Sequence, residues 1–381
     1  MSNKVKFLFI SDLHFGIPET ERELTELRKT FIPYLKEHDI DILFFGGDYF
    51  DHKMGMAEPS SLMAFEFFNE VLTICAEKKI KIRMIEGTQS HDRFQPRIFE
   101  NFIIDSNGNK LVDYKYFETV SSEDIMGIRV LYVPEEYPMN IDEYYAPYKN
   151  DKYDLMIVHG TWDFVNFAAA IDNNRNDINT APVFRVKEWK DALEHGLAIS
   201  GHIHGRHGFK DKSGDKVIYP ASFTAWSFDQ ISDRGFLYGE VEDHKVTYEF
   251  VNNPDSPKYA NLDVKDLGLD LATADVETIK NKIQEQKDKV NYLKVNLDAL
   301  PAEKKLILKE LYKENKGIKA DVSRVRTLFE NADVAKKYKQ YDYLLKDNLS
   351  IEKAIVKYCK EDLNTDITEA EVAEIIKKES K

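Results

Sequence analysis

The sequence has 381 residues, enough for two or three domains, and its 23 Phe and 20 Tyr supply at least one large apolar core. Its formal charge of −14, from 67 Asp and Glu against 53 Lys and Arg, argues against broad non-specific adhesion to nucleic acid. Only Cys75 and Cys359 are present, outside any CxxC spacing, which argues against a disulfide framework and a zinc ribbon. Because no signal-peptide pattern or long apolar run occurs, we expect a cytoplasmic protein without a membrane segment.

The stretch 4–16 opens with an apolar run that is too short for a helix and rich in β-forming residues, so it predicts a buried strand. Asp12 and His14 follow the end of this strand. Four later runs also end in Asp or His: 42–45 before Asp48, 81–86 before His91 and Asp92, 154–158 before His159, and 197–200 before His202 and His204. Since ligand sites of α/β sheets form outside the carboxyl ends of strands, the five endings predict one site.

Mixed imidazole and carboxylate ligands of this kind suit divalent ions such as Mn²⁺, Fe²⁺ or Zn²⁺. Two ions about 3.5–4 Å apart can bind both oxygens of an in-line phosphoryl displacement, and one carboxylate must then bridge them. A single D-x-H or H-x-H pair is weak evidence, because most such pairs are ordinary surface or core residues. The ordered set of five segments is strong evidence, and the glycines beside the ligands permit sharp turns there.

The intervals between these strands predict the remainder of an α/β fold. Leu and Phe recur at spacings of three and four over 19–38, which predicts one amphipathic helix and a parallel, right-handed crossover between its flanking strands. Residues 140–152 are Tyr-rich and irregular, and 162–195 form a long insertion that would border the site. Three alternating runs predict antiparallel strands that complete a second sheet: 217–222, 235–241 and 245–251.

The composition changes after the NPDSP stretch at 253–257, because no Trp follows and Lys and Glu dominate. The periodicity there predicts an α-β-α-β module, and then a helical tail whose apolar faces are too narrow to form a core of their own. The predicted elements of the module are a helix over 276–287, a strand over 291–297, a helix over 301–315 and a strand over 318–326. The predicted domains are 1–253, 254–330 and 331–381.

The segments DLHFG, GGDYFD, GTQSHD, VHG and GHIH, in this order, resemble the calcineurin-like metallophosphoesterases, and among them the SbcD-type nucleases of double-strand-break repair and phage recombination. The resemblance covers 4–252 well. It implies a four-layer sandwich of two mixed β-sheets flanked by helices, with a small α+β capping domain and a helical tail. It also implies roles for the site residues: Asp12, His14, Asp48 and His204 on one metal, His159 and His202 on the other with Asp48 bridging, His91 as general acid or phosphate contact, and Asp92 orienting His91.

The third segment departs from the family pattern. The family has Gly-Asn-His-Asp or Gly-Asn-His-Glu, whose Asn oxygen binds the second metal, whereas here two residues are added and no Asn is present. Ser90, which precedes His91, is the predicted replacement, and the amide oxygen of Gln89 or a water molecule is the alternative. A second departure is Asp51, three residues after Asp48, where some family members carry a histidine. We interpret the neighbouring His52 as a surface residue.

The resemblance implies a DNA exonuclease and endonuclease with two divalent ions, with Mn²⁺ expected, acting as the nuclease subunit of an SbcCD-like repair or recombination complex. The implied partners are DNA, an SbcC-like ABC-type coiled-coil ATPase bound by the tail, and a second copy in a homodimer. The acidic charge indicates that a partner supplies much of the DNA affinity. The alternatives are a phosphomonoesterase or protein phosphatase, which would normally carry Arg shortly after the bridging Asp, and a catalytically silent binding module, which would have lost several ligands. The tail could also fold back on the cap.

Overall fold

The computed structural model describes residues 4–104, 107–165 and 182–321, together with residues 356, 360 and 368–372. Most of the predicted tail (331–381) and part of the predicted insertion (162–195) therefore lie outside the described residues. None of the helices within the described ranges has the length and apolar character needed to cross a membrane.

The first sheet contains six strands: β1 (Lys4–Ile10), β2 (Ile42–Phe45), β3 (Lys81–Ile85), β4 (Tyr114–Phe117), β13 (Gly235–Glu242) and β14 (Lys245–Asn252). Their order is β14-β13-β1-β2-β3-β4. The pairs from β1 to β4 are parallel, whereas β13 and β14 are added antiparallel on the other side of β1. The carboxyl ends of β1, β2 and β3 therefore lie at the same edge.

The second sheet also contains six strands: β5 (Ser121–Ile125), β6 (Ile128–Val133), β7 (Leu155–His159), β10 (Leu197–Gly201), β11 (His207–Asp211) and β12 (Gly214–Tyr219). Their order is β11-β12-β10-β7-β6-β5, with four parallel strands at the centre and an antiparallel strand at each edge. A separate short parallel pair is formed by β8 (Thr161–Trp162) and β9 (Val183–Phe184).

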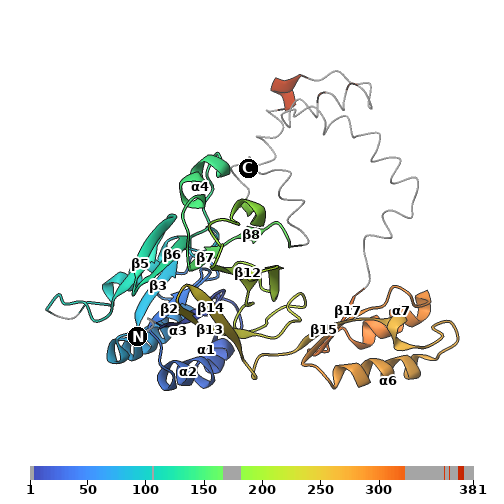
Figure 1. The fold of residues 1–381 in the computed structure, drawn as a ribbon. Helices are drawn as coiled ribbons and strands as arrows, with labels where there is room; N and C mark the ends of the chain where they lie inside the picture. Colours follow the sequence, from blue (N-terminus) through green and yellow to red (C-terminus); the bar gives the residue numbers. More distant parts are fainter. Residues whose placement is uncertain are drawn as a thin grey trace. The chain divides into compact units, whose positions relative to one another are not determined.

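Three apolar clusters hold together the two sheets and their helices. Figure 1 shows the strands and helices as a ribbon. Residues such as Phe9 and Phe44 of the first sheet and Ile157 of the second are buried in one cluster between the sheets. A second cluster joins the first sheet to its helices, and a third joins the outer face of the second sheet to the remaining helix. These helices are α1 (Thr20–Lys29), α2 (Phe31–Glu37) and α3 (Pro59–Lys78) on the first sheet, and α4 (Ile141–Lys149) on the second. The predicted sandwich of two mixed sheets flanked by helices is confirmed.

Two predicted elements differ from the structure in their extent. The single helix expected over 19–38 is divided into α1 and α2 at Thr30, because Pro33 lacks an N–H and its ring conflicts with a continuous helical backbone four residues earlier. The interval 140–152, expected to be irregular, contains α4, which the Asn140 side chain caps by accepting a hydrogen bond from Glu143 N at 3.2 Å. The helix contains Pro147 in its interior.

The placement of the late strands is also corrected. β12 belongs to the second sheet as expected, but β13 and β14 join the first sheet, where β13 pairs with β1 from Lys4↔Glu242 to Phe9↔Leu237. An alternating pattern shows which face of a strand is buried but not which sheet edge accepts it. Here Leu237 and Val241 complete the core between the sheets, and Phe236 packs toward the helices of the first sheet.

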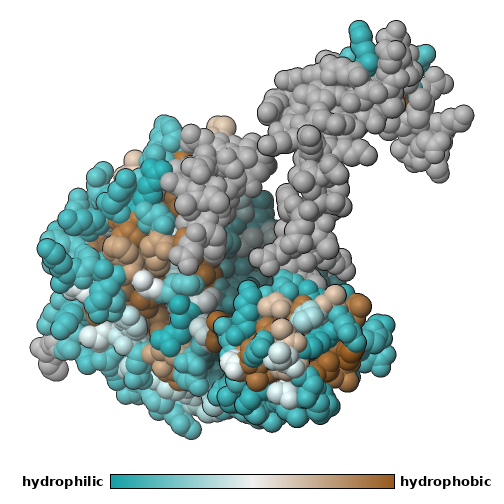
Figure 2. All heavy atoms as spheres, turned by 90° about the vertical axis from the view of Figure 1, so that its right-hand side faces the viewer, coloured by the Kyte–Doolittle hydropathy of each residue, from teal (hydrophilic) through white to brown (hydrophobic). Residues whose placement is uncertain are grey.

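The chain divides into two compact units, of which the smaller comprises, among the described residues, 262–283, 295–315, 319–321 and the described positions beyond 321. A three-stranded sheet of β15 (Tyr259–Asp263), β16 (Tyr292–Asn296) and β17 (Ile318–Asp321) occurs in this part of the sequence, with α6 (Val276–Lys287) and α7 (Ala302–Leu311). α7 leaves Leu306 69%, Ile307 47% and Leu311 49% exposed. Figure 2 shows apolar patches among the polar side chains of this part of the surface.

Candidate metal centre

The five segments that carry Asp and His side chains meet at one edge of the two sheets. Three are loops that follow β1, β2 and β3 of the first sheet, one is the loop that follows β10 of the second, and the fifth is the end of β7, whose last residue is His159. Backbone hydrogen bonds join the first two loops, from Asp12 N to Gly47 O and from His14 N to Asp48 O, both at 3.0 Å. The side chains therefore converge because parallel strands deliver them to the same place.

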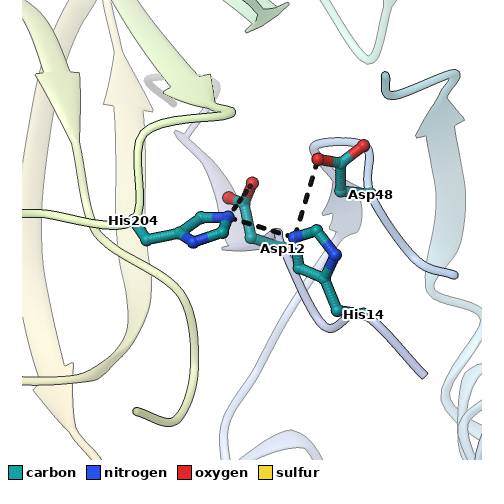
Figure 3. Close-up of side chains that lie close together, drawn as sticks. All are labelled: Asp12, His14, Asp48 and His204. Carbon is teal, nitrogen blue, oxygen red and sulfur yellow. Dashed lines mark hydrogen bonds and ion pairs between the residues drawn. The ribbon is translucent and has the colours of Figure 1, made fainter. Parts of the chain in front are cut away.

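One cluster consists of Asp12, His14, Asp48 and His204, whose ligand atoms all lie within 4.8 Å of one another. Figure 3 shows these side chains pointing toward one another from three segments of the chain. His14 Nε2 lies 3.0 Å from His204 Nε2 and 3.6 Å from Asp48 Oδ2, and His204 Nε2 lies 3.7 Å from Asp12 Oδ1. Two imidazoles and two carboxylates in such a buried group are a suitable donor set for a divalent transition metal.

A second cluster consists of Asp48, His159 and His202, again with ligand atoms within 4.8 Å of one another. His159 Nε2 lies 3.2 Å from Asp48 Oδ2, and its other nitrogen, Nδ1, is 2.8 Å from Gly46 O. The contact with Gly46 fixes the Nδ1 proton, so Nε2 is left as the metal-facing nitrogen. Asp48 belongs to both clusters, which is the arrangement that a bridging carboxylate requires.

The local backbone is held in conformations that would be unfavourable without such a site. Asp12, His14, Asp48 and His202 all have positive φ, between 49° and 82°. Gly87 permits the closest approach, because a Cβ there would lie 2.1 Å from Asp48 N and 2.3 Å from Asp48 Oδ1. The glycine allows Thr88 N to donate to Asp48 Oδ1 at 2.6 Å, which leaves Asp48 Oδ2 directed at the histidines.

Burial and charge set the protonation of the ligands. Burial alone would raise the pKa of Asp48, but His159 and His14 outweigh it and hold that pKa well below its usual range. Burial lowers the pKa of His204 to about 4 and also lowers the pKa of His202. Burial opposes protonation of His159 as well, yet Asp48 raises its pKa well above the ordinary value. The site therefore combines an ionised bridging carboxylate with neutral imidazoles at His202 and His204, and it favours positive charge at His159 beside Asp48.

His91 lies at the edge of the first cluster. Its ring meets the His14 ring edge to face, with centroids 4.8 Å apart, and its Nδ1 contacts the backbone carbonyl of Asp51. The His91 side chain is 31% exposed, so its Nε2 can reach a substrate. Asp92, predicted to orient His91, is instead fully buried and accepts hydrogen bonds from Phe50 N and Gly87 N, both at 2.9 Å. In the structure the Asp51 carbonyl orients His91, and Asp92 holds the two loops together.

The predicted oxygen ligand Ser90 and its alternative Gln89 are both exposed. The hydroxyl that lies beside the second cluster is that of Thr88. Its Oγ1 lies 3.3 Å from each of Asp48 Oδ2, His159 Nε2 and His202 Nδ1. Thr88 directly follows Gly87, as Asn follows Gly in the family pattern, so the two added residues come after the ligand position. Counting forward from Gly87, instead of back from His91, would have found it.

Two further residues at the site escaped sequence analysis. Glu135 follows β6 and directs its carboxylate toward His202, with Oε2 3.2 Å from His202 Nδ1. Trp226 packs edge to face on His14 and His204, with ring centroids 5.2 and 5.1 Å apart, and donates its backbone N–H to Gln230 Oε1 at 2.8 Å. The Gln230 amide in turn contacts His204 Nδ1 at 2.9 Å. The strand-end position of Glu135 was its one sequence signal, and Trp226 had none.

The fold and the donor set together define a metal-dependent phosphoesterase. Residues 5–206, more than half of the chain, match the calcineurin-like phosphoesterase family, and the chain belongs to that family. The ligand residues fit two divalent ions, since Asp and His donors form two clusters that share one carboxylate.

Two solved structures that match the chain share little sequence with it. GAP50, the anchor in the inner membrane complex of Plasmodium, is 11% identical over 66% of this chain and 85% of that chain, with a TM-score of 0.38. The protein of unknown function AQ665 from Aquifex aeolicus is 18% identical over 49% of this chain and 93% of that chain, with a TM-score of 0.22. No curated protein matches the chain.

Proposed function

We propose that the protein is a two-metal phosphodiesterase that hydrolyses DNA as the nuclease subunit of an SbcCD-like repair or recombination complex. The proposal rests mainly on the position of Asp48. Its Oδ2 lies 3.6 Å from His14 Nε2 and 3.2 Å from His159 Nε2, so Asp48 belongs to both candidate metal sites. Two bound divalent ions would generate a hydroxide nucleophile and stabilise the charge that develops on the phosphate. We expect Mn²⁺ as the native ion.

The chain supplies its own proton donor. The His91 Nδ1–H donates a hydrogen bond to the Asp51 carbonyl. This bond leaves Nε2 as the ring nitrogen that is available to a substrate. In its protonated form His91 would hold a phosphate oxygen or protonate the leaving oxygen. The fixed ring orientation supports this role because general acids act only within hydrogen-bond distance of the atom that they protonate.

The surroundings of Asp48 support a diester substrate. A monoester dianion needs a fixed positive charge beside the bridging carboxylate, but Tyr49 and Phe50, which follow Asp48, are each 2% exposed and turn into the core. Trp226, half-buried against His14 and His204, offers an aromatic face beside the first cluster. Such a face can stack on a nucleobase.

The protein partner is proposed from charge and from the resemblance. A chain with a formal charge of −14 binds DNA weakly by itself, so an ATPase subunit would supply much of the affinity. The exposed Leu306, Ile307 and Leu311 of α7 support a protein interaction without identifying the partner. The proposed ATPase-binding tail, 331–381, lies mostly outside the described residues. A homodimer is part of the same proposal.

The decisive experiment compares substrates with Mn²⁺ present. We expect hydrolysis of linear duplex DNA, single-stranded DNA and bis-p-nitrophenyl phosphate, and little hydrolysis of p-nitrophenyl phosphate, with the duplex rate increased by an SbcC-like ATPase. The His91→Ala variant, purified identically, controls for contaminating nucleases. Preferential hydrolysis of the monoester would contradict the diester proposal.

A truncation tests the partner. Removal of 333–381 should leave the two metal clusters intact, because every ligand and every strand of the two large sheets lies upstream. Association with the ATPase should be lost, with Leu344, Leu345, Ile351 and Ile355 as the proposed anchors. A truncated chain that still co-purifies with the ATPase, or that loses small-diester hydrolysis, would show that the proposed role of the tail is wrong.

A further inference from the structure

Glu135 is a buried carboxylate that faces the second metal cluster. It follows Pro134 at the end of β6, where β6 pairs in parallel with β7, and it is 5% exposed. Its Oε2 lies 3.2 Å from His202 Nδ1 and 3.3 Å from Thr88 Oγ1. The Tyr137 hydroxyl donates a hydrogen bond to the other oxygen, Oε1. One oxygen is therefore held by the protein, and the other is directed at the cluster.

The distances around Thr88 resemble those of atoms that share a metal. Thr88 Oγ1 lies 3.3 Å from each of four donor atoms, which belong to Asp48, His159, His202 and Glu135. Two pairs among these donors, Asp48 Oδ2 with His159 Nε2 and His202 Nδ1 with Glu135 Oε2, are each 3.2 Å apart. Neighbouring ligands with metal bonds of about 2.0–2.2 Å lie roughly 3.0–3.5 Å apart, so each of these two pairs has the spacing of neighbouring ligands. Glu135 lies just outside the group of Asp48, His159 and His202, whose ligand atoms are all within 4.8 Å of one another, and it reaches that group through His202.

We propose that Glu135 is a ligand of the second metal and that, with the Thr88 hydroxyl, it replaces the Asn oxygen that this chain lacks. The proposal rests on the two-metal function proposed above and specifies one of its sites. The second site would then contain two carboxylates, Asp48 and Glu135, and two imidazoles. Carboxylate oxygens favour Mn²⁺ and Mg²⁺, whereas a site of two imidazoles and one carboxylate is better suited to Zn²⁺.

Metal titration of substituted chains tests this role without any measurement of hydrolysis. The affinity and stoichiometry of Mn²⁺ and Zn²⁺ are measured by calorimetry for the unmodified chain, Glu135→Ala and Glu135→Gln. We expect Glu135→Ala to weaken the second Mn²⁺ about 100-fold or more while the first Mn²⁺ is unchanged. Zn²⁺ should be weakened less. Glu135→Gln should lie between the two, since its amide oxygen can still bind a metal but carries no charge.

The matched control is Glu136→Gln. Glu136 is the next residue, but its carboxylate accepts hydrogen bonds from Val120 N and the Tyr144 hydroxyl, away from both clusters. Its substitution should leave both Mn²⁺ affinities unchanged. In each Glu135 variant, retention of the first Mn²⁺ shows that the sandwich has folded.

A rescue variant separates ligation from an indirect effect through His202. If Glu135 is a ligand, adding Thr88→Asn to Glu135→Ala should restore the second Mn²⁺ at least tenfold, because an amide oxygen returns at the family position. Equal weakening of Mn²⁺ and Zn²⁺ in Glu135→Ala without rescue would mean that Glu135 only positions His202, and unchanged Mn²⁺ affinity would mean that it has no role; either overturns the proposal. If the unmodified chain binds two Mn²⁺ but does not cleave DNA, the proposed function fails while the assignment of Glu135 is still decided by binding.

Discussion

The two candidate metal sites share Asp48 but are assembled in different ways. The first site takes its other ligands, Asp12, His14 and His204, from the D-x-H and G-H-x-H segments, where spacing alone fixes which side chains meet. The second takes His159 and His202 from the VHG and G-H-x-H segments, but its surrounding oxygens, on Thr88 and Glu135, come from the altered third segment and from the loop after β6, which has no family pattern. The difference teaches that the imidazole ligands are fixed by strand ends, whereas the oxygen donors can be exchanged between neighbouring loops.

The largest expected effect comes from the residue that the two sites share. Asp48→Asn should abolish two-metal occupancy and hydrolysis together, because its negative charge holds two cations close against their mutual repulsion. Bound metal is measured by calorimetry, and hydrolysis with a small diester. Asp12→Asn provides the comparison, since Asp12 belongs only to the first cluster and should leave the second metal bound. If Asp48→Asn retains both metals and a near-normal rate, the shared-ligand assignment is wrong.

The next effect separates catalysis from metal binding. His91→Ala should keep both metals and lose a general-acid contribution of about 10² to 10⁴ in rate, because His91 lies beside the first cluster, with its Nδ1 on the Asp51 carbonyl, and belongs to neither of the two clusters that share Asp48. Rates are compared at saturating Mn²⁺, with metal content determined on the same preparations. A variant that loses a metal would identify His91 as a ligand, in the group that it forms with His14 and Asp51.

The same contrast explains how much of the site could be predicted from sequence. The strand that precedes Asp12 and those near Asp48, His159 and His204 were predictable, because each apolar run, turn and ligand is contiguous in the chain. Glu135 was not, because a single glutamate after a strand has no pattern and reaches His202 only through the parallel pairing of β6 with β7, where Val133 lies opposite Val158. Such proximity is a property of the sheet order.

Thr88 and the late strands show two other limits. The insertion in GTQSHD could be placed before or after the ligand position, and sequence alone offered no reason to prefer Gly87 as the fixed point over His91. For β13 and β14, the alternation correctly predicted two antiparallel strands, but only the packing of Leu237 and Val241 between the sheets determines that they extend the first sheet. In both cases, local pattern predicted the element and tertiary packing decided its place.

A smaller effect tests the oxygen donor of the second site directly. Thr88→Ala should weaken the second Mn²⁺ about tenfold, with the first unchanged, because the Thr88 hydroxyl lies 3.3 Å from His159 and His202 nitrogens. Ser90→Ala and Gln89→Ala, both at exposed positions, are the matched controls and should leave both affinities unchanged. Metal titration decides between them. Weakening by Ser90→Ala alone would restore the assignment made from sequence.

The smallest effect lies outside both sites and shows that stability can change while metal binding does not. Glu23 on α1 is fully buried, and neither of its carboxyl oxygens has a hydrogen-bond partner in the described part of the chain. Burial raises its pKa well above the usual value, Glu26 and Glu19 add to the rise, and Arg22 opposes it. At pH values above the ordinary carboxyl pKa, Glu23 is therefore protonated in the folded chain and ionised in the unfolded chain. Stability is fully present below that ordinary pKa and falls as pH rises toward the folded-state pKa, by up to about 1.4 kcal/mol per pH unit.

Glu23→Gln removes the titrating group, so this decline should disappear and the variant should gain stability relative to the unmodified chain as pH rises above the ordinary carboxyl pKa. Urea unfolding at several pH values measures the difference, and metal titration of the same samples should show both affinities unchanged. Glu21→Gln, at an exposed position of the same helix, is the control and should shift stability by less than about 0.5 kcal/mol at every pH. A Glu23→Gln variant whose stability runs parallel to that of the unmodified chain over this range would show that Glu23 is ionised in the folded protein, with a partner that compensates its burial.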